Sequence, residues 1–144
     1  MPEHPNVQRI RDAYAALAEG DLTEALKVLA PTATIHIGGS GPLSGDRTGI
    51  DSITNALVGV FELTAGTQKL DITSIYADDR HGVVVMSETA SRPDGATLDL
   101  EEVHVLAIDD DGCITDQWDL PSDPEAHDRF FDGEQAVGSR RWRG

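Results

Sequence analysis

The chain of 144 residues carries a formal net charge of −15, which predicts a single acidic domain with a core of its own. Its 11 lysines and arginines form no continuous basic stripe, so Coulomb repulsion argues against nucleic acid and anionic membranes as partners. The single cysteine, Cys113, excludes an internal disulfide and a zinc site built from several thiolates of one chain. No export signal or membrane-spanning run is recognisable, so we expect a cytoplasmic protein.

The first half of the sequence has helical periodicity. After Pro5, apolar side chains at helical spacing predict an amphipathic helix that ends near residue 20. Asp21 and Glu24 have the spacing of a capping box, which predicts a second helix that is stopped by Pro31. We then expect a short strand at 32–37, a glycine-rich loop at 38–49 and a third helix. That helix has four apolar residues on one side, Ile50, Ile53, Leu57 and Phe61.

After residue 67 the periodicity becomes that of strands. Segments 68–77, 82–91, 97–109 and 114–120 alternate or are continuously apolar, and turn sequences at 93–95 and 110–112 join the last three. A short helix at 122–131 follows them. Helices followed by an antiparallel meander predict an α+β domain at 1–132, with 133–144 as a flexible tail.

Several familiar functional motifs are missing from the sequence. The loop at 38–49 has neither a G-x-G-x-x-G spacing nor a G-K-[ST] ending, which argues against nucleotide binding. No two histidines stand at i,i+2 or i,i+4, so we predict no metal site, and no serine lies in a nucleophile elbow. By strand parity His36 points away from the face of Ile35 and Ile37, so we expect it on the outer surface or at an interface.

The segment from Leu98 to Ile108 has the pattern of a buried strand with two unexpected residues in its middle. Its even-numbered residues share one face, which combines four large aliphatic side chains with Glu102 and His104. Burying an acid and an imidazole among aliphatic groups costs several kcal/mol unless they are paired, neutral or hydrated. Two interpretations follow: the pair is a structural hydrogen-bonded unit of the core, or it belongs to a pocket.

Two long segments resemble a known family. The sequence "DAYAALAEGDLTEALKVLAPTATIHIGG" resembles the opening of the NTF2-like superfamily in its ketosteroid-isomerase and SnoaL-like polyketide-cyclase branch, and "EEVHVLAIDDDGCITDQWDLPSDPEAHDRFF" is similar to the closing strands and terminal helix of SnoaL-like proteins. The resemblance implies a cone-shaped barrel in which three N-terminal helices pack in a strongly curved antiparallel sheet around an apolar pocket. It also implies a homodimer formed through the outer sheet face.

The resemblance can be carried over residue by residue. The carboxylate base of the isomerases falls at Ile37, and their tyrosine falls at Ala13, with Tyr14 one position away on a different helical face. Because two of the three isomerase roles are missing, steroid isomerisation by that mechanism is disfavoured. The cyclase pattern fits better and implies a catalytic set of Glu102, His104 and Asp119. Our choice of Asp119 over Asp116 rests on parity, and a slip by one residue would turn Trp118 inward instead.

Such a set could move a proton at a carbon next to a carbonyl group, without a metal or an organic cofactor. Cyclase, dehydratase, epoxide hydrolase and isomerase activities stay open, although Arg92 and Arg129 are poorly placed for an epoxide hydrolase. A non-catalytic module that binds a small apolar or aromatic ligand, or that dimerises, is the alternative. We expect eight residues to line or support the pocket: Tyr14, Leu17, Ile37, Phe61, Val85, Leu100, Leu106 and Trp118.

Overall fold

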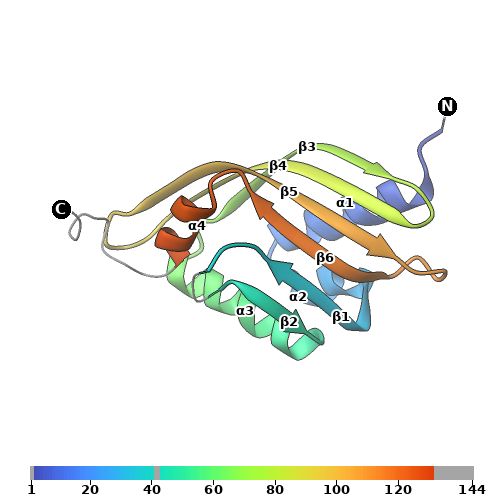
Figure 1. Cartoon of the computed structure of the whole chain (residues 1–144), viewed down its shortest axis with the longest axis horizontal. Helices are drawn as coiled ribbons and strands as arrows, with labels where there is room; N and C mark the ends of the chain where they lie inside the picture. Colours follow the sequence, from blue (N-terminus) through green and yellow to red (C-terminus); the bar gives the residue numbers. More distant parts are fainter. Residues whose placement is uncertain (1, 41–42, 132–144) are drawn as a thin grey trace.

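The computed structural model describes residues 2–40 and 43–131, so the predicted tail at 133–144 and the domain boundary at 132 lie outside the described residues. The fold is the expected mixture of helices and one curved sheet (Figure 1). The helical elements are α1 (Pro5–Ala18), α2 (Leu22–Ala25), the 3-10 turn η1 (Leu26–Val28), α3 (Ile50–Thr64) and α4 (Pro124–Phe131). The strands are β1 (Leu29–Ile37), β2 (Gly45–Thr48), β3 (Lys69–Ala77), β4 (His81–Ser91), β5 (Thr97–Ile108) and β6 (Ile114–Pro121).

The six strands form a sheet in the order β2-β1-β6-β5-β4-β3. Neighbouring strands are antiparallel except for β1 and β6, which run parallel. The family resemblance implied an antiparallel sheet, which holds for four of the five pairings, and the parallel pairing of β1 with β6 departs from it. The turns at 93–95 and 110–112 connect β4 to β5 and β5 to β6 as predicted, with Gly95 and Gly112 in the left-handed conformation that tight turns require.

Two short elements differ from the expectation. The second helix is only one turn of α-helix followed by η1, and Pro31 lies inside β1 instead of ending a helix. The loop predicted at 38–49 contains β2, which pairs with the end of β1. Glycine, proline and serine dominate that segment, so its composition hid a strand that is specified by pairing and not by local propensity.

The helices and the sheet enclose the core. In Figure 1, α1 and α2 lie behind the sheet, and α3 packs along the sheet edge formed by β1 and β2. Ile10 of α1, Ile53 of α3 and Leu106 of β5 are fully buried between these layers. A second apolar cluster lies under α4, where Phe130 and Phe131 pack on Leu98 and Leu100. The two clusters lie at opposite ends of β5, with its two central polar residues between them.

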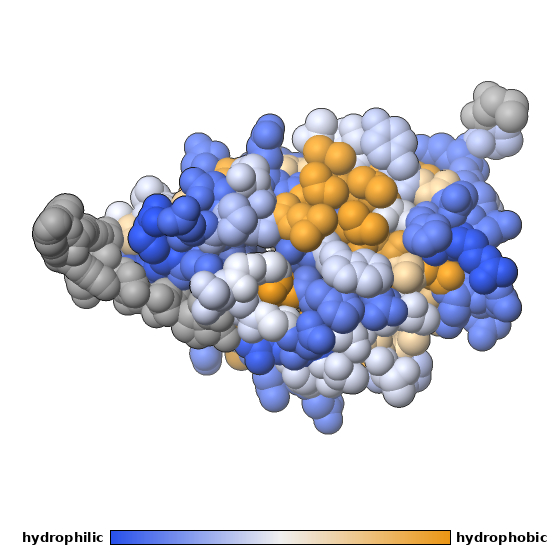
Figure 2. Space-filling view, viewed as in Figure 1, coloured by the Kyte–Doolittle hydropathy of each residue, from blue (hydrophilic) through white to orange (hydrophobic). Residues whose placement is uncertain are grey.

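The opposite face of the sheet is turned away from the helices. Figure 2 shows apolar side chains gathered near the middle of the molecule in this view. Outward-facing valines of β4 and β5 are only half-buried, and Leu120 of β6 is 48% exposed. Among the described residues, the helices are all too short or too polar to cross a bilayer.

Candidate active site

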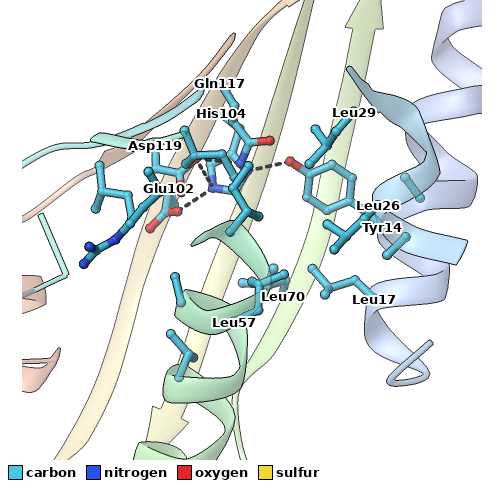
Figure 3. A pocket seen from close by; sticks show the side chains of 18 of the residues that line it. Tyr14, Leu17, Leu26, Leu29, Leu57, Leu70, Glu102, His104, Gln117 and Asp119 are labelled. Atoms are coloured by element: carbon cyan, nitrogen blue, oxygen red, sulfur yellow. Dashed lines mark hydrogen bonds and ion pairs between the residues drawn. The ribbon is translucent and has the colours of Figure 1, made fainter. Parts of the chain in front are cut away.

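Three elements bring polar side chains to one end of an apolar cavity. Glu102 and His104 lie two residues apart on β5 and point to the helix side, as the alternation along that strand requires. The antiparallel register pairs His104 with Asp119 of β6. Tyr14 reaches the same point from α1, so one imidazole has neighbours from two strands and a helix (Figure 3).

His104 is the centre of this arrangement. Its Nδ1 lies 2.5 Å from the Tyr14 hydroxyl, and its Nε2 lies 2.6 Å from Glu102 Oε2. The same Nε2 is 3.2 Å from Asp119 Oδ1, and the Gln117 amide donates to that oxygen at 2.8 Å. Both ring nitrogens therefore have partners at hydrogen-bond distance.

The charges follow from these contacts. Burial opposes a charge on His104, but the carboxylates of Asp119 and Glu102 outweigh it and raise the pKa of the imidazole. Burial alone would raise the pKa of Glu102, yet its hydrogen bond with His104 lowers it. We therefore assign an imidazolium–carboxylate pair, in which Nε2–H donates to Glu102 and Nδ1–H donates to Tyr14.

This assignment leaves the Tyr14 proton free to point elsewhere. Burial, reinforced by the carboxylates of Asp119 and Glu102, raises the pKa of Tyr14 well above its usual value, so the phenol stays protonated. Burial also raises the pKa of Asp119, against the opposing effect of His104. The cavity thus receives one hydrogen-bond donor and one carboxyl group of increased basicity.

The walls of the cavity are apolar. It has a volume of about 150 Å³, and α1, η1, α3 and the sheet line it with aliphatic side chains, including Leu17, Leu26, Leu57 and Leu70 (Figure 3). A dry cavity of about this size holds a benzene-sized molecule. The enclosed part therefore suits a ligand of one or two rings.

The structure brings six of the sequence-predicted residues to the cavity. Glu102, His104 and Asp119 form its polar end, and Tyr14, Leu17 and Ile37 line it as well. Ala13 and Tyr14 both line the cavity, so Tyr14 contributes its hydroxyl even though the isomerase tyrosine falls at Ala13.

Two predicted lining residues face outward, and that prediction is wrong for both. Trp118 is 37% exposed and stacks on His36, with ring centroids 5.0 Å apart, because Asp119 takes the inward position on β6. Phe61 is 66% exposed, since α3 turns its neighbour Val60 to the cavity instead.

The other three candidates are also corrected. Val85 lies on the outer face, because Val84 is the valine of β4 that points inward. The three consecutive valines at 83–85 conceal this parity in the sequence. Leu100 and Leu106 are on the predicted inward face, but they pack in the two apolar clusters on either side of the polar pair and do not line the cavity.

Several polar residues of the cavity were missed from the sequence. Glu88 on β4 had a readable signal, since it shares the inward parity of Val84 and Met86. His127 lies on α4 and Gln68 lies just before β3, and neither stands in a pattern that predicts a site. Arg47 lines the cavity from β2, the strand that the sequence did not reveal.

Sequence comparison decides the family. The profile of the SnoaL-like domain family matches residues 10–117, most of the chain. The chain belongs to the SnoaL-like family. This SnoaL-like protein is 24% identical over 131 residues to the uncharacterized protein Rv0034 of Mycobacterium tuberculosis strain H37Rv, an alignment that covers 91% of the chain and 99% of that relative.

Solved structures support the NTF2-like fold of this SnoaL-like protein. Bal32a, from a soil-derived mobile gene cassette, superposes with a TM-score of 0.82 at 26% identity, covering 88% of this chain and 95% of its own. A putative SnoaL-like polyketide cyclase from Jannaschia sp. CCS1 gives a TM-score of 0.71 at 13% identity, covering 93% and 99%. The second likeness establishes the fold alone.

Proposed function

We propose that this protein is a small-molecule enzyme that moves a proton at a carbon next to a carbonyl group. Aldol-type cyclisation of a polyketide-like substrate, or a related isomerisation or dehydration, belongs to this chemistry. The observation that carries the proposal is that Asp119 and the Tyr14 hydroxyl both contact His104 at the polar end of a largely apolar cavity. The name of the Jannaschia neighbour, a putative polyketide cyclase, points the same way.

Each side chain has one role in this scheme. Asp119 takes the proton from the carbon, and the electron pair of the broken C–H bond moves onto the carbonyl oxygen. Tyr14 donates a hydrogen bond to that developing enolate oxygen, while the imidazolium of His104 donates to Tyr14 and makes the phenol a stronger donor. Glu102 holds His104 in its charged, oriented form.

The reaction can then end in three ways. Asp119 returns its proton to a different carbon in an isomerisation or to a departing hydroxyl in a dehydration. In a cyclisation the enolate carbon attacks a second carbonyl carbon of the same substrate, and the new alkoxide takes the proton from Asp119. All three outcomes use the same first step, so that step is the one to test.

Deuterium exchange measures this step without knowledge of the natural product. We would incubate the protein in D₂O with α-tetralone and 1-indanone, two-ring ketones chosen for the cavity volume, and follow loss of the α-proton signal by NMR. Asp119→Asn should slow the exchange by at least about 100-fold. Asp116→Asn is the matched control, because Asp116 lies on the same strand but contacts His36 on the outer face.

The enzyme proposal would be contradicted if these ketones stabilise wild type thermally and yet their α-protons exchange no faster with the protein than in buffer alone. That result would favour the non-catalytic ligand-binding module. Equal exchange rates in the two aspartate variants would remove Asp119 from the mechanism.

We also propose that two copies of this protein pair through the outer sheet face. Half-buried valines of β4 and β5 and the exposed Leu120 lie on that face and support this pairing. Sedimentation velocity should give the mass of a dimer for wild type and of a monomer for Val105→Lys, which places a charge at the centre of that surface. A wild-type monomer at micromolar concentration would contradict the pairing.

A further inference from the structure

A second polar cluster lies in the cavity beside His104. Glu88 of β4, Glu102 of β5 and His127 of α4 all line the cavity, and their side chains are 3%, 6% and 10% exposed. His127 Nε2 lies 3.8 Å from Glu88 Oε1 and 3.7 Å from Glu102 Oε1. Both distances are too long for an N–H···O hydrogen bond. The three groups therefore converge without a direct hydrogen bond to His127.

The two carboxyl groups are oriented by their outer oxygens. Gln68 donates to Glu88 Oε2 at 2.6 Å, and His104 donates to Glu102 Oε2 at 2.6 Å. The inner oxygens, Glu88 Oε1 and Glu102 Oε1, are fully buried and accept no hydrogen bond from an N–H of the described residues, although the two carboxyl groups can hydrogen-bond to each other when one is protonated. Buried acceptors of this kind are costly and rare in native proteins. Both of them face His127.

We propose that Glu88 Oε1, Glu102 Oε1 and His127 Nε2 bind a divalent cation of the Zn²⁺ or Mn²⁺ class. One ligand atom from each of the three residues lies within 4.8 Å of the other two, and the residues come from three different elements. Ligands about 2.0–2.2 Å from a common metal, at tetrahedral or wider angles, lie about 3.3–3.9 Å apart. The separations of His127 Nε2 from the two carboxylate oxygens, 3.8 Å and 3.7 Å, fall in that range.

The donor set also fits. Two carboxylate oxygens and one imidazole nitrogen suit borderline and hard divalent metals, and three protein ligands facing a cavity leave coordination positions for a substrate oxygen or water. Gln68 and His104 would act as the outer partners that fix the ligating carboxylates. The site goes beyond the proton-transfer function and shares one residue with it, Glu102.

A proton is the competing occupant of this cluster. Burial, together with the neighbouring Glu102, raises the pKa of Glu88 to about 8, so the two carboxyl groups can share a proton near neutral pH. A shared proton would satisfy the carboxyl oxygens but leaves the approach of His127 unexplained.

The neighbouring trio gives the contrast within the same cavity. Glu102, His104 and Asp119 also converge closely enough to bind a metal. There, however, His104 Nε2 lies only 2.6 Å and 3.2 Å from the two acids, distances at which a proton fills the space. The wider spacing around His127 therefore assigns the cation to that cluster and the proton to His104.

Isothermal titration calorimetry with ZnCl₂ and MnCl₂ tests the site on full-length protein stripped with EDTA. We expect saturable binding of at least one cation with one ion per chain. Glu88→Gln and His127→Gln should each weaken that binding by at least about 10-fold. His36→Gln should bind like wild type, because it removes another histidine that lies between two carboxylates, on the outer face.

Two results would overturn the proposal. The first is no saturable binding of either cation to folded wild type, which would assign the cluster to a shared proton. The second is equal affinity in wild type and His127→Gln, which would place the ion elsewhere on the surface. Far-ultraviolet circular dichroism checks the fold of each variant, and His127→Gln decides the question if Glu88→Gln does not fold. Deuterium exchange by metal-free wild type tests the proton-transfer function separately.

Discussion

Two histidines of this protein each lie between two acidic side chains, on opposite faces of one sheet. His36 is hydrogen-bonded to Asp46 at 2.8 Å and to Asp116 at 3.0 Å on the outer face, where Trp118 stacks on its ring. His104 lies between Glu102 and Asp119 on the inner face, with Tyr14 as its aromatic partner. Their side chains are 28% and 7% exposed.

The difference lies in the surroundings and not in the residue types. Solvent screens the outer group, whose acids Asp46 and Asp116 are 65% and 37% exposed, so each contact contributes little. The inner group is buried, where a charge without its partner is costly and where a donor can be aimed at a ligand. The difference between a candidate active site and a surface ion pair is therefore the burial of His104 by α1 and the cavity walls.

The largest effect should come from removing each histidine in turn. We expect His104→Leu to lower the free energy of unfolding by about 3 kcal/mol at pH 7, because it leaves the buried carboxyl of Glu102 without its partner. His36→Leu should cost at most about 1 kcal/mol. Urea unfolding followed by circular dichroism measures both, and equal losses would show that burial does not separate the two groups.

An intermediate effect should come from the aromatic partners. Tyr14→Phe removes the hydroxyl that we propose donates to the enolate oxygen. It should slow the α-proton exchange of the bound ketone by about 10- to 1000-fold, and the upper part of this range is typical of one lost oxyanion-hole donor. Trp118→Phe, on the outer face, should leave the rate unchanged. If Tyr14→Phe exchanges at the wild-type rate, the phenol has no part in the reaction.

The smallest effect should be the pH dependence of the outer group. Hydrogen bonding to Asp116, against a smaller opposing effect of burial and with further help from Asp46, raises the pKa of His36 above its unfolded value of about 6.5. A raised imidazole pKa adds stability that is complete below the unfolded pKa and is lost as the pH rises through the folded one.

The stability difference between wild type and His36→Gln should therefore be greatest near pH 5.5 and should shrink above neutrality, with a total below about 1 kcal/mol. Urea unfolding of both proteins at a series of pH values measures this difference. A difference that grows with pH would have the wrong sign for a histidine held by acids.

The meander and the inward pair Glu102 and His104 could be predicted because local sequence patterns specify them. Period-two alternation along residues 98–108 and glycine at each turn specify β5 and its neighbours without reference to the rest of the chain. Family resemblance added the curved sheet and an aspartate on the next strand. Parity favoured Asp119 over Asp116, and the structure places Asp119 inward opposite His104.

The rest depends on contacts between distant segments. Neither the parallel pairing of β1 with β6 nor the meeting of His127 with Glu88 leaves a local pattern in the sequence. The run of valines at 83–85 is equally apolar on both faces, so parity could not be assigned there. Phe61 was misplaced because a helical stripe drifts around the axis, and the cavity follows Val60 instead.

The parallel pairing of β1 with β6 also has a consequence for how the chain folds. Strands β3 to β6 are joined by short connections and can pair with their neighbours in sequence, whereas Ile37 must find Asp119 more than 80 positions later. Closing so long a loop is slow compared with forming hairpins. The meander should therefore form first, and the cavity should be completed only when β1 docks and α1 brings Tyr14 to His104. Ligand binding would then report the last step of folding.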